Sequence, residues 1–103
     1  MTRATVHRWD AIALDKITEM IACKTIVAGR QTLIQSYLKR GALVPRHVHE
    51  GDELIMVLQG ALRVVVDGDE VTVRESEVVS VPAGMPHEAE AIDDTFVLDI
   101  RSQ

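Results

Sequence analysis

The sequence predicts a single all-β domain, folded as a sandwich or a closed barrel. Short apolar runs alternate with Gly, Pro and Asp turn residues along the chain, and several runs alternate apolar with polar residues. Aromatic residues make up only 3% of the chain, so the core must be built from aliphatic side chains, many of them β-branched and strand-favouring. With 103 residues there is room for one compact domain, which we expect to span residues 1–103.

Two extended runs in the N-terminal half predict a hairpin. They cover residues 17–27 and 31–39 and are separated by Ala28-Gly29-Arg30, a plausible turn. Before them, residues 1–15 form a predicted N-terminal arm. Its Trp9 could anchor it in the domain's own core or against a second subunit.

Six further short strands are predicted after Gly41. The apolar runs that predict them cover residues 54–58, 62–66, 71–73, 78–81, 87–92 and 95–101. The turns between them are marked by Gln59-Gly60, Asp67-Gly68, Pro82-Ala83-Gly84 and Asp93-Asp94.

The composition also excludes several partners. The formal charge is −5 and no Lys/Arg cluster offsets it, so nucleic acids and anionic membranes are poor partners. The single cysteine, Cys23, excludes an intramolecular disulfide. No signal-peptide pattern opens the chain and no uninterrupted apolar run could span a bilayer, so we expect a cytoplasmic protein.

Three of the four histidines and one glutamate have a spacing that suits a metal site. His47 and His49 are two residues apart, so on a strand both imidazoles leave the same face. Glu53 follows at another even offset, with Gly51 allowing a bend. A site built on one strand would be loosely held, so the fourth ligand should come from another strand, and His87 is the best-placed candidate. The predicted ligands are therefore His47, His49, Glu53 and His87.

Imidazole and carboxylate donors suit one divalent transition metal ion, such as Fe²⁺, Mn²⁺, Ni²⁺, Zn²⁺, Cu²⁺ or Co²⁺. Four protein ligands on an octahedral ion would leave two positions for substrate or water. The nearby acids Glu50 and Asp52 could compete with Glu53 as ligands, although solvated loop acids are the default expectation.

These residues resemble the two motifs of the cupin superfamily. The first motif, at residues 41–60, reads Gly41-x5-His47-x-His49-x3-Glu53-x6-Gly60. The second, at residues 76–91, reads Pro82-x-Gly84-x2-His87, with Ser76 in place of the usual glycine and Ala91 in place of the usual asparagine. The resemblance implies a small, single-domain, RmlC-like cupin: a jelly-roll (double-stranded β-helix) barrel with a metal ion inside, commonly a homodimer.

Asp99 interrupts an otherwise apolar strand. An acid in such a strand is costly to bury unless it is paired, which makes it a candidate general base, while an edge-strand aspartate facing water is the alternative. The segment Thr95-x-Val97-Leu98-Asp99, with Lys39-x-Gly41, resembles the small cupins of pectin and alginate breakdown, which convert 4,5-unsaturated uronates to linear keto forms. In that family the matching aspartate is catalytic, and Arg101 stands where the family has an aromatic residue.

Three functional hypotheses follow. The first is a metal-dependent isomerase or lyase acting on an unsaturated or keto sugar acid, with Asp99 moving a proton. The second is an iron-dependent dioxygenase resembling the quercetinases. The third is a non-catalytic cupin that binds a small ligand or a metal. All three imply a small-molecule partner, and the fold alone does not choose among them.

Overall fold

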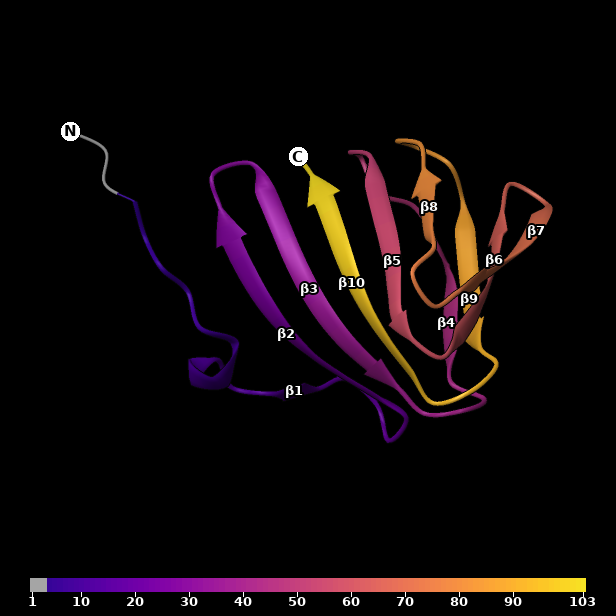
Figure 1. Ribbon diagram of the computed structural model, residues 1–103. Helices are drawn as coiled ribbons and strands as arrows, with labels where there is room; N and C mark the ends of the chain where they lie inside the picture. Colours follow the sequence, from indigo (N-terminus) through magenta and orange to yellow (C-terminus); the bar gives the residue numbers. More distant parts are fainter. Residues whose placement is uncertain (1–3) are drawn as a thin grey trace.

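Two antiparallel sheets make up the computed structural model, which describes residues 4–103 (Figure 1). The six-stranded sheet has the order β1-β2-β3-β10-β5-β8 and the four-stranded sheet the order β4-β9-β6-β7. The strands are β1 (Asp15–Lys16), β2 (Ile21–Ala28), β3 (Gln31–Leu38), β4 (Leu43–His47), β5 (Glu53–Gln59), β6 (Ala61–Val66), β7 (Asp69–Arg74), β8 (Val78–Val81), β9 (His87–Ala91) and β10 (Thr95–Ser102). The predicted all-β jelly-roll fold is confirmed.

Helical structure among the described residues is limited to a 3₁₀ turn, η1 (Trp9–Ala11). In residues 4–103 we find no helix with the length and apolar character needed to cross a membrane.

The core lies between the inner faces of the two sheets. On β5 the residues Ile55 and Val57 are buried, whereas their neighbours on the other face are more exposed, which is the period-two pattern of a strand with one covered face. Val97 on β10 extends the same face, and Leu62 and Val64 on β6 meet it from the small sheet. Burial of these aliphatic side chains stabilises the fold by about 1.5–3 kcal/mol each.

The predicted N-terminal hairpin forms, but its first strand begins later than expected. Gly29 makes the turn with a φ of 60°, which favours glycine. The prediction that the first strand starts at residue 17 is wrong, because the Thr18 hydroxyl accepts a hydrogen bond from the Met20 amide. This local turn competes with strand pairing. The amide of Ile17 instead donates to the carbonyl of Ile21, closing a bend before β2.

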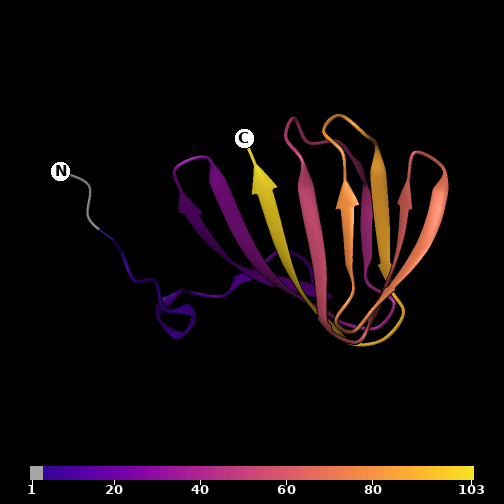
Figure 2. The ribbon, with the colours of Figure 1, turned by 45° about the horizontal axis from the view of Figure 1, so that its top comes forward.

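Figures 1 and 2 show the β2–β3 hairpin on one side of the molecule, away from the four strands of the small sheet. The N-terminal arm continues beyond it; the first three residues of the predicted arm lie outside the described residues. The side-chain amine of Lys24 on β2 donates a hydrogen bond to the Trp9 carbonyl over 2.8 Å. The contact ties the arm to β2 of the same chain.

Ser76 occupies a turn that normally requires glycine. Its φ is 71°, in the left-handed region that side chains with a Cβ rarely adopt. The turn forms nonetheless, because the Ser76 amide donates to the Val57 carbonyl at 2.9 Å and the Glu77 amide to the Arg74 carbonyl at 2.9 Å. The serine in place of the motif's usual glycine therefore leaves the turn before the second motif intact.

Candidate metal centre

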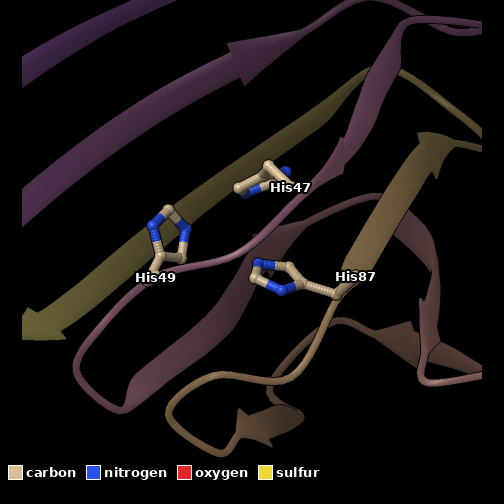
Figure 3. A group of neighbouring side chains, drawn as sticks. All are labelled: His47, His49 and His87. Atoms are coloured by element: carbon tan, nitrogen blue, oxygen red, sulfur yellow. The ribbon is translucent and has the colours of Figure 1, made fainter.

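Three histidines converge near the end of the barrel at which the C-terminus lies (Figures 1 and 3). His47 is the last residue of β4, His49 lies in the loop that follows, and His87 is the first residue of β9. One ring nitrogen from each lies within 4.8 Å of one from each of the other two. Such a group of imidazoles can hold one metal ion.

Strand pairing brings His47 and His87 together. They are opposite each other in the β4–β9 ladder, and their ring centroids are 4.2 Å apart. The prediction that His47 and His49 share one strand face is wrong, because β4 ends at His47 and His49 lies in the loop beyond it. The loop turns His49 back toward the other two rings instead, as Figure 3 shows.

Gly51 lets this loop approach the end of β10. A Cβ at position 51 would lie 1.7 Å from the Ser102 carbonyl oxygen, an impossible contact with a backbone atom. Two hydrogen bonds fasten the loop to the turn before β9: Gly84 donates to the His49 carbonyl at 2.9 Å, and Ala83 donates to the Asp52 carboxylate at 2.9 Å. The Asp52 carboxylate therefore stabilises the turn before β9.

We expect Gly51→Ala to weaken metal binding by at least about tenfold, because the loop that carries His49 must move away from Ser102. Isothermal titration with Co²⁺ measures the affinity. The control is Gly29→Ala in the distant hairpin, which strains a left-handed backbone at a cost of about 1–2 kcal/mol but touches nothing near the histidines. Equal affinities in the two variants would contradict this role for Gly51.

Glu53 begins β5 and its side chain is only 2% exposed. Its Oε1 lies 3.0 Å from His87 Nε2 and 3.6 Å from His49 Nε2. Its Oε2 accepts a hydrogen bond from Arg101 Nε at 3.0 Å. Glu50, by contrast, is exposed on the loop. Of the three acids near the histidines, Glu53 is the one that faces them.

Several buried polar atoms at this site form no hydrogen bond. Within residues 4–103, the buried side-chain nitrogen and oxygen atoms that form no hydrogen bond are His49 Nε2, Glu53 Oε1, His87 Nε2 and Asp99 Oδ1. Leaving such a group unsatisfied costs about 1–3 kcal/mol. The His87 nitrogen and the Glu53 oxygen approach closely but do not have hydrogen-bond geometry. Three of the four atoms belong to predicted metal ligands, so this donor set fits a divalent cation.

Backbone carbonyls orient two of the imidazoles so that Nε2, and not Nδ1, is the nitrogen left for a metal. The Nδ1 of His47 is 2.7 Å from the Pro45 carbonyl and that of His87 is 2.9 Å from the Met85 carbonyl. A carbonyl can only accept, so in the neutral form of each ring the proton lies on Nδ1, which leaves the Nε2 lone pair available to a metal. At His49, burial lowers the pKa, and the positive charge of Arg101 lowers it further, so the neutral ring is favoured.

Asp99 and Arg101 lie beside Glu53 on the inner face of the large sheet. Arg101 pairs with Glu53 across β10 and β5, and Asp99 lies two residues before it on the same face. Burial, followed by the negative charge of Glu53, raises the pKa of Asp99 to about 7, while Arg101 opposes the rise. Arg101 Nη2 reaches Asp99 Oδ2 at 3.4 Å.

Arg101 is the residue of this site that the sequence reasoning did not place there. The signal was present, because Val97, Asp99 and Arg101 alternate with a period of two and must share a strand face. The predicted water-facing alternative for Asp99 is not observed, since this residue is 9% exposed.

Comparison with known proteins decides the family. The family model described as "Cupin domain" matches residues 34–100, which is more than half of the chain and includes all four predicted ligands. The chain belongs to the cupin family. No curated protein matches the sequence of this cupin.

Solved structures share the fold. KdgF from Halomonas sp. superposes with a TM-score of 0.89 at 22% identity, over 97% of this chain and 94% of that one. An RmlC-like cupin from Shewanella frigidimarina gives 0.89 at 17% identity, over 97% and 91%. Oxalate decarboxylase from Bacillus subtilis gives 0.85 at 17%, over 98% of this chain but 31% of that one. At these identities the similarity shows the fold alone.

Proposed function

We propose that this cupin is a metal-dependent enzyme that isomerises or cleaves a small polar molecule. The observation that carries the proposal is the set of buried, unpartnered polar atoms. Three of them belong to the group that would hold a metal ion, and the fourth belongs to Asp99 beside it. A bound metal ion and a proton-transferring carboxyl group would together give every unpartnered atom in that set a function.

In this proposal His47, His49, Glu53 and His87 hold the ion. When bound, a divalent ion supplies Lewis acidity toward a carbonyl or hydroxyl oxygen. Asp99 takes a proton from the substrate and returns it, a role suited to a carboxyl that is buried and has one free oxygen. Ile55, which lies opposite Asp99 on β5, gives the site an apolar wall and limits water access on that side.

An unsaturated or keto sugar acid is the substrate class that we favour. Support comes from the resemblance of the segment ending at Asp99 to the cupins of pectin and alginate breakdown, and from the overlay on KdgF over nearly the full length of both chains. The predicted homodimer and the predicted cytoplasmic location stay predictions.

Turnover of 4,5-unsaturated uronates, followed by loss of the absorbance of the conjugated double bond, tests the proposal. We expect activity that disappears after chelation and returns on addition of one equivalent of a divalent metal ion, because the Lewis acid is needed for the reaction. Measurement with an oxygen electrode distinguishes a dioxygenase from the proposed enzyme, since an isomerase or lyase consumes no O₂. Oxygen uptake by the iron-loaded protein with a flavonol or catechol, together with no turnover of any uronate, would reject the proposal.

A further inference from the structure

Arg101 connects two buried carboxylates of the candidate metal centre, those of Glu53 and Asp99. Its Nε donates to Glu53 Oε2 at 3.0 Å, and its Nη2 donates to Asp99 Oδ2 at 3.4 Å. The side chains of Glu53 and Asp99 are 2% and 12% exposed, whereas that of Arg101 is 32% exposed. The guanidinium therefore reaches inward from the rim and holds one oxygen of each acid.

The two carboxylate oxygens of Glu53 therefore have different surroundings. Oε2 is occupied by Arg101, and Oε1 is unpartnered and lies near two histidine nitrogens. We propose that Arg101 is a positioning residue that holds Glu53 so that a single oxygen, Oε1, is presented to a metal ion. The proposal rests on the proposed metal centre and concerns a position where the uronate cupins have an aromatic residue.

A second arginine in the same molecule shows what an ordinary ion pair looks like. Arg63 also contacts two acids, Glu70 and Glu90, but their side chains are 57% and 37% exposed. Water can replace Arg63 at both acids, so this surface network contributes little. Water has no such access to Glu53, so without Arg101 the Oε2 atom would be left buried and unpaired, and the carboxylate would turn to seek another donor.

Electrostatics alone makes the opposite prediction. A fixed positive charge next to a cation site repels the incoming ion, so removal of Arg101 would tighten metal binding if charge were its only effect. If Arg101 positions Glu53, its removal weakens metal binding despite the lost repulsion. The sign of the change in affinity therefore distinguishes the two roles.

The test is Co²⁺ affinity, measured by isothermal titration for the wild type and for Arg101→Met. We expect the variant to bind about 10–100-fold more weakly, the usual effect of losing a group that orients a metal ligand. Arg63→Met is the matched control and should bind as the wild type does. Arg101→Lys keeps the charge but loses the two-pronged contact, so it should also bind more weakly, and it replaces the methionine variant if that one does not fold.

A double-mutant cycle locates the effect on Glu53. In a Glu53→Ala background, Arg101→Met should produce no further loss of Co²⁺ affinity, because there is no carboxylate left to position. The visible absorption of bound Co²⁺ should change in Arg101→Met and not in Arg63→Met, since the freed carboxylate alters the ligand set.

The outcomes separate this inference from the metal centre itself. Wild-type protein that binds Co²⁺, with Arg101→Met binding equally well or more tightly and giving an unchanged spectrum, overturns the role of Arg101 alone. Wild-type protein that binds no Co²⁺ overturns both proposals. A further loss of affinity in the Glu53→Ala background would show that Arg101 does not act through Glu53.

Discussion

Replacement of His87 by alanine should reduce affinity for divalent transition metals by more than about 100-fold, beyond the range seen when only an outer partner of a ligand is lost. His87 is 4% exposed and its Nε2 forms no hydrogen bond, so this buried atom is available to bind a metal ion. His47→Ala should have a similar effect, since its ring faces that of His87 at 4.2 Å.

His7 supplies the matched control. It is the fourth histidine of the chain and lies exposed on the N-terminal arm, so His7→Ala should bind metal as the wild type does. Titration with Co²⁺ or Mn²⁺ gives the affinities, and the rise in melting temperature on adding metal provides an independent measure, because a ligand that binds only the native state stabilises it. Undiminished binding by His87→Ala would place the metal elsewhere.

Asp99→Asn should lower the turnover number for an unsaturated uronate by about 10²–10⁴-fold, the usual contribution of a positioned acid or base. The amide is nearly isosteric with the carboxylate but does not accept the proton. Co²⁺ affinity should change little, because Asp99 Oδ2 contacts Arg101 and not the histidines. Asp69→Asn, at an exposed position on β7, is the control. A wild-type rate in Asp99→Asn would remove this residue from the mechanism.

The same substitution has a predictable effect on stability in metal-free protein. Because the pKa of Asp99 is about 7 in the folded chain against an ordinary 3.8, the stability that it contributes is fully present below pH 3.8 and is lost as the pH rises through 7. Asp99→Asn removes that loss. The variant should therefore exceed the wild type by up to about 4 kcal/mol in free energy of unfolding at pH 8, and the difference should shrink toward pH 4. Urea titrations at both pH values measure it and also show that the variant folds.

Much of the fold could be predicted because its signals are local. Asp67-Gly68 and the alternation of Leu62, Val64 and Val66 specify a turn and a strand within a few residues of sequence. The structure places β6 and β7 on either side of that turn, with Val66 opposite Asp69. The start of β2 was predicted wrongly, because the hydroxyl of Thr18 forms a turn that apolar periodicity does not reveal.

The sequence was enough to predict which histidines form the site, but not how the backbone brings them together. The histidines could be found from spacing, yet the sequence did not indicate that β4 ends at His47. The loop conformation depends on the approach of Gly51 to Ser102, 51 residues later, and no local pattern encodes such a contact. The pairing of Arg101 with Glu53 likewise arises from the register between β10 and β5.

The most direct test of the central claim is a crystal of the protein grown with Co²⁺ and measured at the cobalt absorption edge. We expect one strong anomalous peak per chain, within about 2.0–2.2 Å of a nitrogen from each of His47, His49 and His87 and of Glu53 Oε1. A map with no peak among these residues, or with its peak on the exposed acids of the loops, would contradict it.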